Sequence, residues 1–87
     1  MSTSSVRDVI IDTVTEVARY RQPLLPRAGS EQTLSGDLGL ESLDLAQLVA
    51  ELELRLGVDP FAQGATARIV TVGELISVYE KACVKSG

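Results

Sequence analysis

The 87-residue chain has no histidine and no tryptophan, one cysteine, and only two tyrosines and one phenylalanine. Without histidine it lacks the usual base for a serine or cysteine nucleophile and the commonest zinc ligand, which argues against hydrolase and zinc functions. Cys83 has no second cysteine for an internal disulfide, so the sequence is compatible with a reducing compartment. A core must therefore be built mainly from leucine, valine and isoleucine.

Basic charge and long apolar runs are also in short supply. Eight Lys and Arg residues stand against twelve Asp and Glu, a formal net charge of −4. That excess disfavours nucleic acids and anionic membrane surfaces, because both repel an acidic protein. Residues 1–7 are polar and the apolar run at 9–11 is short, which predicts neither a signal peptide nor membrane insertion. We expect a cytoplasmic monomer that binds no nucleic acid.

The composition, 45% hydrophobic, suits one small domain over residues 1–87, with an ordered core at about 5–84. A first helix is predicted to begin near Ser4 or Ser5, where a hydroxyl caps free N–H groups, and to end by Gln22. Its buried stripe is predicted to comprise Val6, Val9, Ile10, Val17 and Tyr20.

Residues 23–40 contain proline, glycine and serine without a sustained helical period, which predicts an unusually long connecting loop. A loop of this length needs anchors in the core. The predicted anchors are Leu24, Leu25, Leu34, Leu38 and Leu40.

A second helix is predicted from about Ser42 to Leu56 and is apolar on two sides. Its core stripe is predicted to be Leu45, Leu48, Val49, Leu52 and Leu56. Leu43, Ala50 and Leu54 lie nearly opposite, as a second stripe that fits accident, loop packing or a partner surface equally well. An i,i+4 pair of Glu51 and Arg55 is expected on one flank, and Gly57 is expected to end the helix.

Downstream of Gly57, a short turn of helix is predicted around residues 65–69 and a last helix after Thr71. Thr71 and Glu74 have the spacing of a capping box. The buried face of this helix is predicted to comprise Val72, Leu75, Ile76, Tyr79 and Cys83.

Acidic residues offer no metal site or acid–base pair. A calcium loop starting at Asp37 would need glycine at its sixth position and glutamate at its twelfth, where the chain has Ser42 and Leu48. Glu51 and Glu53 are two residues apart on a helix and point in different directions. We expect no metal, no catalytic residues and no intrinsic enzymatic activity.

Ser42 is the most informative residue of the chain. It ends the run Asp-Leu-Gly-Leu-Glu-Ser at residues 37–42, just where the second helix should begin. Free N–H groups and the positive end of the helix dipole make that a favourable place for a phosphate ester. The competing interpretation is a serine that only caps the helix.

The surroundings of Ser42 resemble the phosphopantetheine attachment region of acyl carrier proteins. The matching features are Gly39, the acid Glu41 directly before the serine, the aliphatic Leu43 and the acid Asp44 after it, and a long helix with an apolar outer stripe. The segment Ile-Val-Thr-Val-Gly-Glu-Leu at residues 69–75 also looks like the one leading into that family's last helix.

The resemblance implies an all-α four-helix bundle of three longer helices and one short helix, with a long loop between the first and second. It implies that Ser42 receives 4′-phosphopantetheine from coenzyme A through a phosphopantetheinyl transferase, and that acyl groups are held on the arm as thioesters. Ligases, ketosynthases and acyltransferases are the implied partners. The expected partner surface is Glu41, Leu43, Asp44, Gln47, Ala50, Glu51 and Leu54.

Two departures from the family pattern bear on function. Glu41 replaces the usual aspartate before the serine, and Gln47, Ala50, Leu54 and Arg55 dilute the acidity typical of fatty-acid carriers. The diluted acidity favours a stand-alone carrier of specialised biosynthesis, such as polyketide or hybrid pathways. The alternatives are an aminoacyl or peptidyl carrier of a nonribosomal pathway, which uses the same attachment chemistry, and an unmodified helical interaction module.

Overall fold

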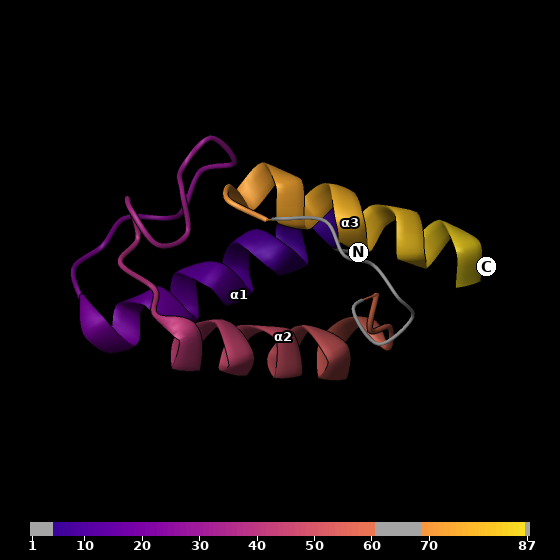
Figure 1. Ribbon diagram of the computed structural model, residues 1–87, viewed down its shortest axis with the longest axis horizontal. Helices are drawn as coiled ribbons and strands as arrows, with labels where there is room; N and C mark the ends of the chain where they lie inside the picture. The colour runs from indigo at the N-terminus through magenta and orange to yellow at the C-terminus, as the bar shows by residue number, and fades with distance from the viewer. Residues whose placement is uncertain (1–4, 61–68, 87) are drawn as a thin grey trace, which may run out of the picture.

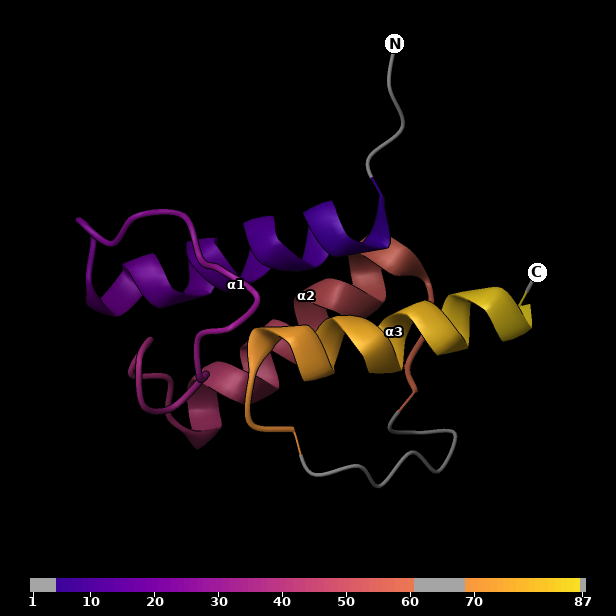
Figure 2. The ribbon, with the colours of Figure 1, turned by 90° about the horizontal axis from the view of Figure 1, so that it is seen from above.

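The computed structural model describes residues 5–60 and 69–86, the last four as backbone only, and forms three helices. They are α1 (Val6–Arg21), α2 (Ser42–Leu56) and α3 (Val72–Ser86). The described residues contain no strand, only an isolated bridge between Thr33 and Thr71. Figures 1 and 2 show the helices side by side, with α1 running opposite to α2 and α3. The predicted all-helical class is confirmed, whereas the short helix around 65–69 falls almost wholly outside the described residues.

Helix α1 is the central element, because it packs against both α2 and α3. It begins where predicted: the Ser5 hydroxyl accepts the Asp8 N–H at 3.2 Å. Ile10, Val14 and Val17 are buried at its core face. The prediction that Tyr20 belongs to this stripe is wrong, since Tyr20 is exposed. The buried face extends instead toward Ile11 and Ala18, which are both buried, and is thereby turned away from Tyr20.

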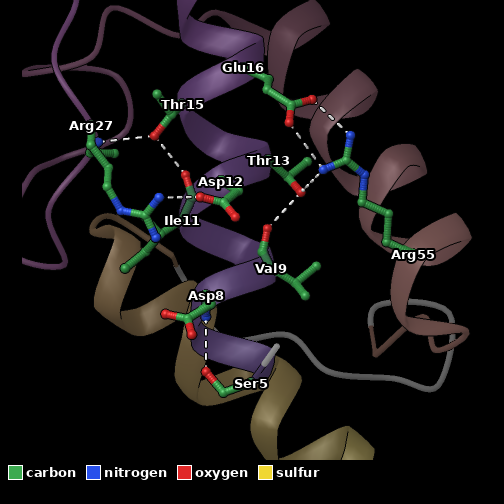
Figure 3. A network of polar contacts seen from close by, with 11 residues as sticks. Ser5, Asp8, Val9, Ile11, Asp12, Thr13, Thr15, Glu16, Arg27 and Arg55 are labelled. Atoms are coloured by element: carbon green, nitrogen blue, oxygen red, sulfur yellow. Dashed lines mark hydrogen bonds and ion pairs between the residues drawn. The ribbon is translucent and has the colours of Figure 1, made fainter. Parts of the chain in front are cut away.

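Two buried threonines of α1 connect it to its neighbours (Figure 3). The Thr13 hydroxyl donates to the Val9 carbonyl at 2.7 Å and accepts from Arg55 of α2 at 2.9 Å. The Thr15 hydroxyl donates to the Ile11 carbonyl at 2.7 Å, and it accepts a backbone N–H from the loop, that of Ala28, at 3.0 Å. Each buried oxygen is satisfied, so these polar groups lie in the core without the penalty of a lost hydrogen bond.

The loop between α1 and α2 is held by three buried leucines, Leu34, Leu38 and Leu40, with Leu25 packed against the core as well. These predicted anchors are confirmed, but Leu24 is almost fully exposed. The Leu25 N–H bonds to the Gln22 carbonyl at 3.0 Å. The tight turn closed by that bond directs Leu25 inward and leaves Leu24 outside.

The loop is also hydrogen-bonded to the start of α3. The Leu34 N–H donates to the Val70 carbonyl at 2.9 Å, and the Val72 N–H donates to the Gln32 carbonyl at 3.0 Å. Gly73 donates to the Ser30 carbonyl at 2.8 Å, an approach so close that a Cβ on Gly73 would meet that oxygen at 3.1 Å. These bonds satisfy backbone groups that an irregular segment would otherwise leave unpaired.

Helix α2 begins and ends as its sequence predicts, and helix α3 begins as its sequence predicts. Gly57 terminates α2 with φ of 74°, in the left-handed region that glycine adopts without strain. At the start of α3, the Glu74 N–H bonds to the Thr71 hydroxyl at 3.2 Å and the Glu74 carboxylate accepts the Thr71 N–H at 3.0 Å, which confirms the capping box. The predicted core residues of α3, Val72, Leu75, Ile76 and Tyr79, are buried.

The core cluster joins these helices. Leu48 and Leu52 are fully buried on α2, with Leu45 and Leu56 partly buried beside them. Val49 is only half-buried and does not belong to the cluster, so it lies at the edge of the predicted stripe. The side chain of Cys83 falls outside the described residues, which leaves its place in the core a prediction.

Candidate functional site

The backbone before Ser42 is fixed at several points. Thr33 and Asp37 close the preceding turn with two reciprocal bonds: the Thr33 N–H donates to the Asp37 carboxylate at 2.9 Å, and the Asp37 N–H donates to the Thr33 hydroxyl at 2.8 Å. Gly39 follows with φ of 70°, a conformation that disfavours any side chain. It stands between the buried Leu38 and Leu40. The chain therefore enters α2 from an anchored turn.

Ser42 is the first residue of α2 and is exposed. The capping position before it belongs to Glu41, whose backbone is extended, with φ of −102° and ψ of 176°. The Ser42 hydroxyl makes no hydrogen bond to any of the residues that the structure describes. Ser42 is thus not the helix cap that the competing interpretation requires, and it is exposed beside the positive end of the helix dipole.

Acidic residues flank Ser42 on both sides. The Asp44 carboxylate accepts the Glu41 N–H at 2.9 Å and also accepts a hydrogen bond from Arg21, the last residue of α1. The Arg21 guanidinium reaches the Glu41 carboxylate as well, at 3.5 Å. The hydrogen bond from the Glu41 N–H, followed by that from Arg21, lowers the pKa of Asp44 below its ordinary value. Asp44 therefore remains charged and is held within its own chain.

The expected partner residues divide into two groups. Leu43, Gln47, Ala50 and Leu54 are exposed on the outer side of α2, and Glu41 is exposed at its start. Asp44 and Glu51 are half-buried and engaged in ion pairs.

Arg55 compensates the second acid of this surface. It pairs with Glu51 at 3.9 Å, as the i,i+4 spacing predicts, but its shorter contact is to Glu16 of α1 at 2.8 Å. The hydrogen bond from Arg55 lowers the pKa of Glu16. The acidity of α2 is thus offset by arginines of the same chain at both of its ends.

Sequence reasoning missed Arg21. It lies 23 residues before Asp44, and no local spacing connects the two. The only signal in the sequence is a basic residue in the last turn of a helix, which the helix dipole explains without any reference to Ser42.

Two other kinds of site are absent from the described part of the chain. The described side chains, those of residues 5–60 and 69–82, include no group of three or more His, Cys, Asp or Glu close enough to bind a metal ion. None of the helices described is both long and apolar enough to cross a membrane.

In a comparison with known families, residues 8–77 match the family described as "Phosphopantetheine attachment site". The matched region runs from the first turns of α1 into α3 and includes Ser42 with its anchored turn. No curated protein and no solved structure matched the chain. An exposed serine hydroxyl beside free N–H groups fits the phosphate end of the group that this family carries. The chain belongs to the phosphopantetheine attachment-site family, whose members are carrier proteins with a covalently attached 4′-phosphopantetheine.

Proposed function

We propose that the chain is a discrete acyl carrier protein, a single carrier domain over residues 1–87 in which Ser42 bears the 4′-phosphopantetheine arm. The observation that carries this assignment is the exposed Ser42 hydroxyl at the first position of α2, next to Glu41 as the cap. The short helix around 65–69, which would complete a four-helix bundle, is part of the same proposal.

Attachment requires a phosphopantetheinyl transferase and coenzyme A. The bond between the Ser42 oxygen and phosphorus forms while the phosphoanhydride bond of coenzyme A breaks. Adenosine 3′,5′-bisphosphate leaves, and the hydroxyl proton passes to the transferase. When bound, the arm supplies a thiol that holds acyl groups as thioesters. The carrier itself contributes the attachment point and a surface for recognition.

The proposed recognition surface follows the outer side of α2. It comprises Glu41, Leu43, Asp44, Gln47, Ala50, Glu51 and Leu54. Leu43 is exposed directly after the attachment serine, where an apolar side chain can enter a pocket of a partner enzyme. Acyl-loading and acyl-processing enzymes such as ligases, ketosynthases and acyltransferases are the proposed partners.

The charge of α2 favours specialised biosynthesis, such as a polyketide or hybrid pathway, over fatty-acid synthesis. Gln47, Ala50 and Leu54 interrupt the acids along its outer side, and Arg21 and Arg55 pair with acids at its two ends. Long-range steering toward basic partners is weaker when acids are paired. An aminoacyl or peptidyl carrier of a nonribosomal pathway fits the same observation and remains the second candidate.

Intact mass spectrometry tests the attachment. Purified protein is incubated with coenzyme A and a broad-specificity phosphopantetheinyl transferase, and one added phosphopantetheine per chain is expected. Ser42→Ala should abolish the gain, whereas Ser35→Ala, at an exposed serine of the loop, should leave it intact. A gain that survives Ser42→Ala, or no gain in the natural chain, would overturn the proposal.

Two further measurements separate the candidates. The group found on the thiol of protein purified from its own host distinguishes an acyl from an aminoacyl or peptidyl carrier. A partner interaction that is unaffected by Ser42→Ala but lost in Leu54→Glu would instead identify an unmodified interaction module.

A further inference from the structure

Arg21 links the end of α1 to both acids that flank Ser42. Its Nε donates to the Asp44 carboxylate, and its Nη2 lies 3.5 Å from Glu41 Oε1. Glu41 is the residue before Ser42, and Asp44 is two residues after it. One guanidinium from another helix therefore contacts an acid on each side of Ser42 in the sequence.

The contact with Asp44 is more than an exposed ion pair. The same oxygen, Asp44 Oδ2, accepts the hydrogen bond from Arg21 and the Glu41 N–H. The Asp44 side chain is only 13% exposed, whereas Asp12 in the comparable pair with Arg27 is 47% exposed. Arg21 thus orients a carboxylate that in turn holds the backbone immediately before Ser42.

The charges at the start of α2 also favour a role for Arg21 at Ser42. Without Arg21, the two carboxylates of Glu41 and Asp44 would face the phosphate groups of coenzyme A as they approach Ser42. One guanidinium offsets one of these two negative charges. The repulsion between a carboxylate and an approaching phosphate acts over a few ångströms, where screening by salt is least effective.

We propose that Arg21 is a positioning residue for phosphopantetheine attachment: it holds the turn from Glu41 to Asp44 so that Ser42 is presented, and it offsets negative charge there. The inference rests on the proposed function of Ser42. Arg21 makes no bond in the reaction, so its effect should fall on recognition of the carrier by the transferase. Replacing it should raise KM for the carrier and leave kcat nearly unchanged.

The experiment measures pantetheinylation kinetics for the natural chain, Arg21→Gln, Arg21→Lys and the matched control Arg27→Gln. Arg21→Gln should lower kcat/KM roughly fivefold to tenfold, mainly through KM, because misplacement of a reacting group and uncompensated charge both weaken productive binding. Arg21→Lys should recover part of the loss, since it keeps the charge but cannot contact two carboxylates with a planar fork. Arg27→Gln should match the natural chain.

A second measurement follows the turn itself. The amide proton of Glu41, hydrogen-bonded to Asp44, should shift upfield and exchange faster in Arg21→Gln than in the natural chain. It should not change in Arg27→Gln. Thermal unfolding of each variant separates this local effect from a general loss of stability.

The outcomes distinguish this inference from the proposed function. If the natural chain is not modified at Ser42, the proposed function fails. If Ser42 is modified but Arg21→Gln has the KM and Glu41 amide signal of the natural chain, the role of Arg21 is refuted while the carrier function stands. An equal rise of KM in Arg27→Gln, or a rise that simply follows the melting temperature, would also refute it.

Discussion

The inner and outer sides of α2 carry the same type of side chain in opposite surroundings. Leu48 and Leu52 are 1% and 0% exposed, whereas Leu43 and Leu54 are 79% and 81% exposed. All four are leucines of one helix, so composition does not separate them. Their spacing along the helix does, because residues three or four positions apart share a side and only one side meets α1.

The outer leucines therefore contribute little to folding. A buried leucine removes its apolar surface from water, whereas an exposed one leaves most of that surface in contact with it. The exposed leucines, of which Leu43 directly follows Ser42, are therefore available for contact with another protein. Four experiments test how far the two sides differ, from the largest expected effect to the smallest.

Truncation of one leucine on each side tests the comparison directly. Leu52→Ala should lower the free energy of unfolding by about 2–5 kcal/mol, because it removes buried methyl groups and leaves a cavity. Leu54→Ala should change it by no more than about 0.5 kcal/mol. Chemical denaturation of both variants measures the difference. Equal losses would show that the outer side is packed, contrary to the structure.

Alkaline pH tests the inner side through Tyr79, which is fully buried on α3. Burial, followed by the charges of Asp59 and Glu53, raises the pKa of Tyr79 to about 12. The raised pKa means that the neutral phenol stabilises the fold fully below about pH 10, and that this contribution is lost as the pH rises toward 12. The loss should reach about 3 kcal/mol.

Denaturation curves between pH 8 and 12 are the measurement, with phenolate absorbance to follow ionisation. Tyr79→Phe is the control, because it removes the titrating group, and its stability should depend less on alkaline pH. An equal dependence in this variant would contradict the assignment to Tyr79.

Substitution of Arg55 tests the polar contacts that lie between the inner and outer sides of α2. Arg55→Ala should cost roughly 1–2 kcal/mol, because it removes the hydrogen bond that Arg55 donates to the buried Thr13 hydroxyl and the ion pair with Glu16. Arg27→Ala, which breaks an exposed pair with Asp12, should cost about 0.2–1 kcal/mol. Thermal unfolding of the two variants makes the comparison, and an equal cost would show that the Thr13 contact adds nothing.

Low pH should have a smaller effect, through the carboxylates that pair with Arg55 and Arg21. The hydrogen bond that Arg55 donates lowers the pKa of Glu16 from its ordinary value of 4.5. The hydrogen bond from the Glu41 N–H, followed by that from Arg21, lowers the pKa of Asp44 from 3.8. Their contribution is complete above about pH 4.5 and declines as the pH falls through the lowered values. Glu16→Gln should show a smaller fall in melting temperature between pH 5 and pH 3 than the natural chain. An unchanged fall would exclude Glu16 as a source.

Local signals were sufficient to predict the helices. The Ser5 cap, the Thr71 and Glu74 capping box and the Gly57 terminus are each contained within a few residues, and the structure has them all. The leucines of α2 were also divided correctly between the two sides. These features depend on hydrogen bonds and periodicity over one or two turns of helix, which the order of residues largely determines.

The predictions were wrong where contacts between distant segments determine which side chains are buried. Tyr20 and Leu24 lie at the end of α1 and in the turn after it, where a small rotation of the buried face and one backbone bond determine what is covered. Residues of the loop bond to the start of α3, some 40 positions further along the chain. No periodicity within either segment encodes that pairing.

The candidate site also combines features that local sequence determines with features that depend on contacts between distant segments. The sequence by itself determined that a glycine-marked turn leads to a serine at the start of a two-sided helix, since dipole, caps and spacing are local properties. Only the tertiary structure decided that Ser42 is left exposed and that Arg21 contacts the acids on both sides of it. An ion pair across 23 residues depends on how α1 and α2 pack, and packing is set by the whole core.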